Sequence, residues 1–503
     1  MMQTRVWLGG LCALSLGALV VACGDDDDDD AFTPPPGTNV DGGNTPVTDG
    51  GDAGTPPSTF AAITPVTTTR LANALNVYGS TFSSDGFLYA SGATIDAGVR
   101  KLAVWRLKDG VLDTTFGTGG VATLEVDDAP TASETSYGIV EVAAGKLVVQ
   151  VVASGRVYLV SLDAATATFG TPKQVTFGWG TDLTGWTGTG ANATPQYSSW
   201  GIALDRSNGT RIVVSAAGAP AKATGGATQR TDNDRWIARV DATTLEADPA
   251  FNGGQAWSAD VDGKALGDNS RRILVLADGS IVQSGYTSLP SGATNLNSVV
   301  IVKLTPAGVA DPAFNFGTTA PLPGQAIFNP YASVSGFGEA YGVVAQSTGR
   351  LVTTGYGTSH AETQSKSLDL VSFGLNADGL DATYGKLGSV AIQSEIDPAA
   401  GVGTTPFMDR GRDLAVLPDD RVVHGGMYDH GATLYVTDPN GALDTGFGAG
   451  GMARYAFPGA FFKVTTSADG KHIAATTESL NQSNDAGTPN ATGAIIATLR
   501  VGE

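Results

Sequence analysis

The chain has 503 residues, of which 42% are hydrophobic and 16% charged, with a formal net charge of −20. The apolar content supports a large core and excludes a fully disordered chain. The negative charge argues against a phosphate-backbone partner, so we expect no nucleic acid. Short runs of Val, Ile, Thr and Tyr between Gly and Asp predict an all-β chain.

Residues 1–22 have the pattern of a secretory signal peptide. One positive charge, Arg5, precedes an apolar and small-residue stretch from Val6 to Ala22. The next residues complete the sequence Val20-Val21-Ala22-Cys23, which resembles a bacterial lipobox. The resemblance implies cleavage before Cys23 and acylation of that residue, hence a membrane anchor in the cell envelope. The outer membrane is the expected site, either periplasmic or surface-exposed, and the alternative is an ordinary signal peptide with an accidental cysteine.

Residues 23–58 are expected to form a tether. Six consecutive carboxylates, Asp25–Asp30, precede a segment rich in Pro, Gly, Thr and Asp. A dense block of like charge stays solvated, and such a composition favours a disordered spacer over a Ca²⁺ site of fixed geometry. The folded body is therefore expected over residues 59–503.

The body is a repeat in which a short turn between two strands recurs seven times. The second turn residue advances from Gly86 by 59, 64, 70, 70, 71 and 50 residues. The seven copies are Asp85-Gly86, Ala144-Gly145, Asn208-Gly209, Asp278-Gly279, Thr348-Gly349, Asp419-Asp420 and Asp469-Gly470. Repeats of this length indicate stacked units that cannot bury their faces alone.

A second turn with an Asp and an aromatic residue follows in six repeats. The clearest copies begin at Asp113, Asp248, Asp311, Asp381 and Asp444, and repeat two keeps Phe169-Gly170. The carboxylates of Asp113, Asp311 and Asp444 are expected to bind the backbone of their own turns. Four strands per repeat predict seven antiparallel blades that close into a β-propeller.

The order of these motifs resembles the delta-60 repeat of bacterial exported proteins. Residues 82–124 carry Asp-Gly, a strand ending in Gly, and Leu-Asp-x-x-Phe-Gly-x-x-Gly, and the resemblance covers roughly 60–501. It implies a β-propeller fold and no particular activity.

The seventh repeat predicts how the ring closes. It stops after the strand Ala494–Leu499, while an additional strand, Ile63–Thr69, precedes the first repeat. We therefore expect residues 63–69 to form the fourth strand of the last blade.

The two faces of such a ring differ in sequence. The turns between first and second strands (A–B) and between third and fourth strands (C–D) are nearly constant, and they share one face, the turn face. The remaining connections vary widely, as in 178–199 and 218–235, and they share the opposite face, the loop face. Variable loops on a rigid scaffold favour a ligand site there, although neutral insertions would look the same.

One position near the start of each innermost strand carries large side chains, which we call the axial ring. Its members are Tyr78, Tyr137, Trp200, Arg271, Tyr341, Arg412 and Phe462. The next residue is Gly in four repeats, which indicates crowding near the axis. We expect the axial ring near the channel mouth on the loop face, either binding a flat or anionic ligand or packing between blades.

Other candidates lie in the variable loops. Trp179 and Trp186 flank one loop and either stack on a ligand or fold the loop onto itself. Asp429 and His430 are further ligand candidates, but they and the neighbouring His360 offer no third metal ligand, so we expect no metal and no cofactor. The sequence contains no Gly-x-Ser-x-Gly, P-loop or His-Glu-x-x-His motif.

Two classes of function are consistent with the sequence. The first is a membrane-anchored, monomeric binding or scaffold module whose ligand is a protein or a glycan. The second is a lactonase- or glycosidase-like propeller hydrolase with carboxylates at the channel mouth. Three or more carboxylate, amide or imidazole groups converging at the mouth would favour the hydrolase, and an aromatic mouth would favour the binding module.

Overall fold

The computed structural model describes most of the body of the chain. The described residues are 60–71, 74–96, 98–126, 134–179, 183–184, 186, 194–224, 229–261, 267–291, 294–317, 323–359, 368–392, 409–429, 431–477 and 493–502. The expected signal peptide, lipidation site and tether lie outside them.

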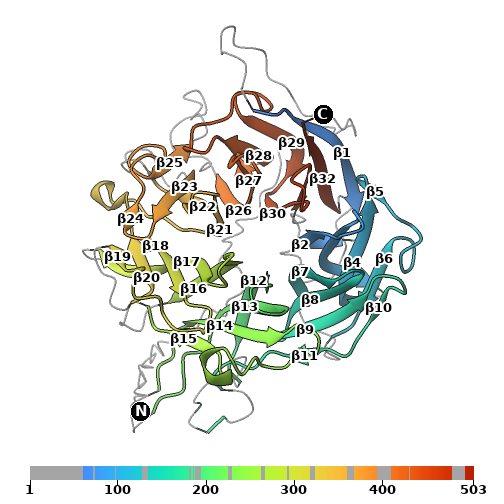
Figure 1. Cartoon of the computed structure of the whole chain (residues 1–503), viewed down its shortest axis with the longest axis horizontal. Coiled ribbons are helices and arrows are strands. Elements are labelled where there is room, and N and C mark those ends of the chain that lie inside the picture. Colours follow the sequence, from blue (N-terminus) through green and yellow to red (C-terminus); the bar gives the residue numbers. More distant parts are fainter. Residues whose placement is uncertain are drawn as a thin grey trace, which may run out of the picture.

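The chain folds into seven antiparallel sheets arranged around a central axis, which makes it a seven-bladed β-propeller (Figure 1). The first three blades run outward from the axis. Their strands are β2 (Ala74–Phe82), β3 (Leu88–Asp96), β4 (Val99–Lys108), β5 (Val111–Leu112) and β6 (Val121–Leu124); β7 (Thr135–Ala143), β8 (Lys146–Ala153), β9 (Arg156–Asp163), β10 (Thr168–Phe169) and β11 (Lys173–Gln174); and β12 (Tyr197–Asp205), β13 (Arg211–Gly218), β14 (Asp234–Asp241) and β15 (Trp257–Ala259).

Blades four to six follow the same plan. Their strands are β16 (Asp268–Val275), β17 (Ile281–Ser291), β18 (Thr294–Leu304), β19 (Phe316–Gly317) and β20 (Gln325–Phe328); β21 (Gly342–Ala345), β22 (Leu351–Gly357), β23 (Asp369–Asn376), β24 (Gly379–Leu380) and β25 (Ser389–Ile392); and β26 (Arg410–Val416), β27 (Val422–Tyr428), β28 (Gly431–Thr437) and β29 (Met452–Pro458). The helical segments among the described residues are the 3-10 turns Asn252–Gly254 and Ala332–Val334.

The seventh blade is built from both ends of the described chain. It consists of β30 (Phe461–Thr466), β31 (His472–Thr477), β32 (Ala494–Val501) and, at its outer edge, β1 (Ile63–Leu71). β1 pairs antiparallel with β32 from Ile63 opposite Val501 to Leu71 opposite Ala494. The predicted closure by the N-terminal strand is therefore confirmed, and Figure 1 shows this strand at the rim beside β32.

The second turn is held by the same contacts in several blades. The carboxylate of Asp311 accepts the backbone N–H of Ala313 at 3.0 Å, as predicted for this turn, and its other oxygen lies 2.9 Å from Lys303 Nζ. Asp113 and Asp444 bind their own turns in the same way. Each turn thus fixes its own backbone and a cation of the same blade.

The apolar core lies between adjacent sheets. One cluster, for example, joins Val423 and Leu434 of blade six to Phe461 and Ile495 of blade seven. Each sheet is therefore buried by its neighbours, as the repeat length indicates. No helix among the described residues has the length and hydropathy to cross a membrane.

Candidate functional site

The axial ring lies inside the channel, where its side chains contact one another. Tyr78 is buried completely and Trp200 is 6% exposed. In six of the seven inner strands the pairing register shifts at the ring member, as between Val77 and Gly79 in β2. A β-bulge turns the strand locally, and here it coincides with the side chain that points to the axis.

Aromatic stacking links ring members from successive blades. The ring centroids of Tyr78 and Phe462 are 4.0 Å apart, and those of Tyr78 and Tyr137 are 5.0 Å apart. Trp200 continues this stack at 5.4 Å from Tyr137 and approaches Tyr341 edge-on. Side chains therefore fill the opening that the ribbons leave at the centre of Figure 1.

The two ring arginines complete this packing. The Arg271 guanidinium lies 4.2 Å from the Trp200 ring centroid and donates hydrogen bonds to the hydroxyls of Tyr286 and Tyr341. Arg412 lies over Tyr341 at 5.0 Å. Such cation–π contacts stabilise a buried guanidinium, and the buried carboxylate of Glu339 interacts electrostatically with both arginines.

The position after each ring member separates the blades into two kinds. Gly79, Gly138, Gly201 and Gly342 occupy it in four blades. A Cβ at Gly79 would lie 2.9 Å from the Gly138 nitrogen, so glycine is required there by the close approach of the next strand.

The other three blades carry charged residues, Arg272, Asp413 and Lys463, at this position. Arg272 donates to the backbone carbonyls of four ring members: Tyr137 at 2.9 Å, Trp200 at 2.5 Å, Phe462 at 2.9 Å and Tyr78 at 3.4 Å. Its Nε lies 3.4 Å from Asp413. One side chain thus binds the inner strands of blades seven, one, two and three.

Asp413 connects the remaining charges at the axis. Its carboxylate lies 2.7 Å from Lys463 Nζ and accepts the backbone N–H of Val464 at 3.0 Å. Burial lowers the pKa of both Arg272 and Lys463, and the negative charge of Asp413 opposes this shift. Arg272 and Asp413 are buried, whereas the side chain of Lys463 is 24% exposed.

These positions decide how the axial ring can act. Tyr78 is the fifth of nine residues in β2 and Trp200 the fourth of nine in β12, whereas Phe462 is the second residue of β30 and Tyr341 precedes β21. The observed contacts correspond to packing rather than to an open ligand site. The side chains pack on other ring members around the axis, and not only between two adjacent blades. The sequence analysis missed Arg272, Asp413 and Lys463, whose signal was three charges at a position otherwise occupied by glycine.

The loop-face tryptophans pack at the junction of blades two and three. Trp179 is 3% exposed, and its indole N–H donates to the carbonyl of Pro220 at 2.8 Å. Trp186 is half-buried and packs edge-on against Trp179 at 5.1 Å between ring centroids. This arrangement corresponds to the alternative in which the aromatic residues fold the loop.

Asp429 pairs with Arg454 at 2.8 Å at the rim of blade six. His430 and His360 lie outside the described residues. His424 is buried in blade six, stacked on Tyr435 at 4.3 Å, and burial lowers its pKa to about 3. Within the described part of the chain no three His, Cys, Asp or Glu side chains are grouped as metal ligands.

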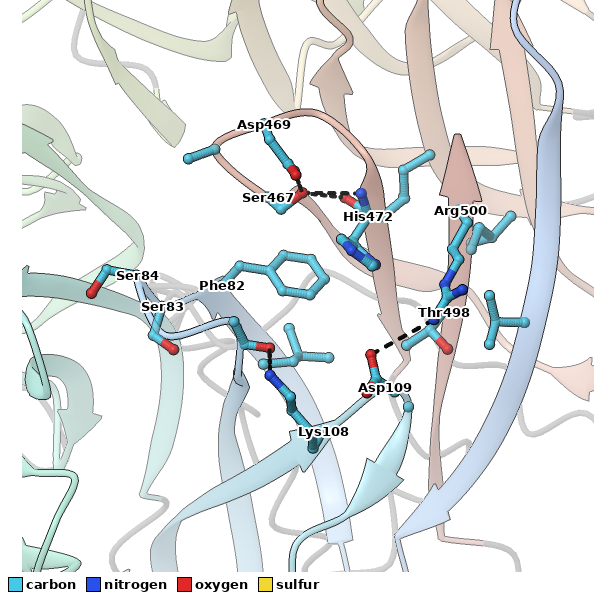
Figure 2. Close-up of a pocket in the computed structure, with 17 residues that line it drawn as sticks. Phe82, Ser83, Ser84, Lys108, Asp109, Ser467, Asp469, His472, Thr498 and Arg500 are labelled. Carbon is cyan, nitrogen blue, oxygen red and sulfur yellow. Dashed lines mark hydrogen bonds and ion pairs between the residues drawn. The ribbon is translucent and has the colours of Figure 1, made fainter. Parts of the chain in front are cut away.

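A pocket of about 350 Å³ opens on the turn face between blades seven and one, at the closure junction. Figure 2 shows Phe82 and His472 next to each other in its lining, with Lys108 and Asp109 below them. Lys108 Nζ lies 3.3 Å from the carbonyl oxygens of both Asp85 and Gly86. The sequence analysis placed no site on this face.

No protein-family model and no curated protein sequence matches the chain. Several solved propellers are similar to it in fold. The Dos1 propeller has a TM-score of 0.42 and 12% identity over 84% of this chain and 77% of that one. The RRP9 WD40 repeats have a TM-score of 0.45 and 12% identity over 87% and 100%. Chaetomium thermophilum Sqt1, bound to the N-terminus of ribosomal protein L10, has a TM-score of 0.38 and 12% identity over 86% and 100%.

Proposed function

We propose that this chain is a lipid-anchored β-propeller of the delta-60 type that serves as a non-catalytic binding scaffold in the cell envelope. The observation that carries the non-catalytic part is the filled channel. All seven axial ring positions are aromatic or arginine residues in contact with other ring members, and Arg272 binds the backbone carbonyls of four of them. An aromatic channel is the outcome that favours a binding module over a hydrolase.

The polar groups at the axis support this proposal further. Arg271 donates to two tyrosine hydroxyls, and Asp413 pairs with Lys463. A channel hydrolase needs a nucleophile or general base that reaches the substrate, and these groups are held by one another. The ligand of the scaffold, a protein or a glycan, is therefore assigned to its outer surfaces.

The face on which β1 begins determines where the tether would join the propeller. β1 begins at Ile63, opposite Val501 at the end of β32, and so on the turn face. A lipid at Cys23 joined through residues 24–58 would attach there. The variable loops would then point away from the membrane, toward partners.

The anchor is tested by fractionating cells that express the full chain or the Cys23→Ser variant. We expect the native protein in the membrane fraction and the variant in the soluble fraction, because acyl chains supply the membrane affinity. A control with Cys12→Ser keeps the cysteine of the lipobox and should remain membrane-bound. Membrane retention of the Cys23→Ser protein would remove the anchor from the proposal.

The loop face is tested after a glycan and metabolite screen has identified a ligand. Trp186→Ala and His430→Ala should weaken binding, while the matched turn-face changes Thr118→Ala and Thr445→Ala should not. The thermal midpoint of each variant is measured as well, because Trp186 packs against Trp179 and a loss of folding must be separated from a loss of binding. If only the turn-face variants disturb this ligand, the loop-face assignment is wrong.

A further inference from the structure

At two junctions of the ring other than the closure junction, an aromatic residue of one blade contacts a glycine of the next blade on the turn face. At the junction of blades three and four, a Cβ on Gly308 would lie 2.7 Å from the ring of Phe251. At the junction of blades five and six, a Cβ on Gly441 would lie 3.0 Å from the ring of Tyr384. At these two junctions the aromatic residue of the second turn thus rests on the glycine of the short turn that precedes the second turn in the next blade. The corresponding glycine of blade five, Gly379, has no atom within 4 Å of its Cβ position.

A backbone hydrogen bond accompanies each of these aromatic contacts. The N–H of Asn252, which follows Phe251, donates to Ala307 at 2.8 Å, and the N–H of Gly385, which follows Tyr384, donates to Asn440 at 2.7 Å. Both acceptors immediately precede the glycine that meets the ring. In the next blade, two consecutive residues therefore bind the aromatic turn: one accepts the hydrogen bond and the following glycine contacts the ring.

Blade one presents the same receptor, Asp109-Gly110, to the closure junction. There the neighbouring blade offers threonines instead of an aromatic ring, and a Cβ on Gly110 would lie 2.2 Å from Thr67 Cγ2 and 2.6 Å from Thr498 Oγ1. β1 pairs with β32 on both sides of this point, and the pairing register shifts at Val66. Asp109, Gly110, Thr498 and Val66 all line the pocket.

The A–B turns also leave this junction open. Elsewhere these turns touch across the blades: Ser84 N–H donates to Glu141 at 2.7 Å between blades one and two, and Ser347 N–H donates to Asp420 at 2.7 Å between blades five and six. At the closure junction the turns 83–86 and 467–470 form opposite walls of the pocket (Figure 2).

The pocket is lined by both apolar and polar groups, which suits an aromatic side chain together with the polar backbone beside it. Leu88, Ile473 and Leu499 supply buried apolar contacts, and hydroxyls and charged groups surround them. Val66, at 43% exposed, lies on the pocket and Val111, at 67% exposed, adjoins Gly110. Exposed apolar residues beside a pocket of this kind mark a protein contact surface.

We propose that the closure junction is a second binding site, on the face opposite the variable loops, which accepts an aromatic side chain presented in a turn of a protein partner. The aromatic ring would occupy the pocket next to Gly110. The N–H after it would donate to the Asp109 carbonyl, as Asn252 and Gly385 do at their own junctions. This proposal is independent of the lipid anchor and of the ligand on the loop face.

The probe is a fluorescent, cyclised peptide with the sequence of the chain's own turn Leu443–Gly451, titrated with the purified protein. A second peptide replaces the phenylalanine by alanine. Cyclisation holds the turn in shape and reduces the entropy cost of binding. We expect the phenylalanine peptide to bind at least about tenfold more tightly than the alanine peptide, since an aromatic anchor dominates such contacts.

The variant Val66→Trp fills the pocket, because Val66 is an exposed residue of its lining. It should weaken binding of the phenylalanine peptide by about tenfold or more. Val309→Trp is the matched control, because Val309 is an exposed turn-face valine in blade four. Thermal unfolding of each variant verifies that it is folded.

Three results would overturn the assignment. Equal binding of the two peptides would show that the aromatic ring is not recognised. An equal loss with Val309→Trp would place binding elsewhere on the turn face. A concentration-dependent dimer that Val66→Trp abolishes would identify a second copy of this chain as the occupant.

Discussion

The residue after each axial ring member has opposite roles in different blades. Glycine lets the backbones of blades one and two approach closely, whereas Arg272 in blade four spans the axis to bind carbonyls of four other strands. The asymmetry is useful because a ring of seven identical long side chains would not fit in one layer. One arginine satisfies several inward-facing carbonyls at once.

Arg272→Met should lower the free energy of unfolding by about 3–5 kcal/mol, because it leaves a buried carboxylate and several buried carbonyls with fewer donors. Urea denaturation followed by tryptophan fluorescence measures this change. Lys146→Met is the control: Lys146 pairs with Asp163 at the surface, with its side chain 58% exposed, and the expected loss is about 1 kcal/mol or less. Equal losses in the two variants would contradict an axial role for Arg272.

His424 should make stability depend on pH in mildly acid solution. Burial lowers its pKa to about 3, against about 6.5 in an unfolded chain, so only the unfolded state gains a proton between these values. Stability from this residue is complete above about pH 6.5 and falls by about 1.4 kcal/mol per pH unit as the pH drops toward 3.

The test compares the native protein with His424→Gln between pH 4 and 7. The variant should show a shallower fall in unfolding free energy than the native protein, by about one proton. Gln keeps a polar group near Thr437, which bonds the imidazole Nε2 at 3.1 Å. Parallel pH profiles for the two proteins would show that His424 is not the titrating group.

At the scale of the element, β1 is the strand on which closure depends. It pairs with β32 over its whole length and buries Ile63 and Leu71. Deleting residues 59–70 removes this ladder and exposes the outer edge of β32. We expect a loss of several kcal/mol in unfolding free energy, from both hydrogen bonds and buried apolar area.

Complementation distinguishes a lost strand from general damage. A synthetic peptide of residues 59–71, added to the deletion protein, should restore the thermal midpoint, because strand addition to an exposed edge reproduces the native pairing. A peptide with the same residues in scrambled order is the control. A deletion protein as stable as the native chain would mean that β1 contributes little to closure.

The strands and turns could be predicted because their signals are local. The Asp-Gly turns and the Asp of the second turn each act within a few residues, as the Asp311–Ala313 hydrogen bond illustrates. The Arg272 network and the closure pocket depend on residues from separate blades meeting at one place. The alignment of the repeats identifies the axial ring. The contacts of Arg272 with four inner strands are seen only in the packed ring.

At the scale of the whole molecule, the two ends of the propeller meet in blade seven. The N–H of Gly502 donates to the carbonyl of Ala62 at 2.8 Å, and Ile63 pairs with Val501. These contacts place the ends in the position of a hairpin. A ring closed this way has no geometric need for its chain ends at this junction.

A circular permutant tests this view of the ring. A short Asn-Gly linker joins Gly502 to Ala62, and new ends are opened between Ser359 and Leu368 in blade five. Asn-Gly favours the tight turn that joins antiparallel strands, so β32 and β1 should form a continuous hairpin. We expect a folded protein whose thermal midpoint equals or exceeds that of the native body, because the linker reduces the entropy lost when β1 docks.

The matched control is the same permutant without the linker, prepared as two co-expressed fragments, 62–359 and 368–502. The two fragments together contain every strand. β1 and β32 are then on separate molecules, which must associate before these strands can pair. Its midpoint should therefore fall with dilution, while that of the linked permutant stays constant. A linked permutant that fails to fold, beside fragments that assemble, would show that the ends do not lie as a hairpin in solution, and closure by β1 would have to be abandoned.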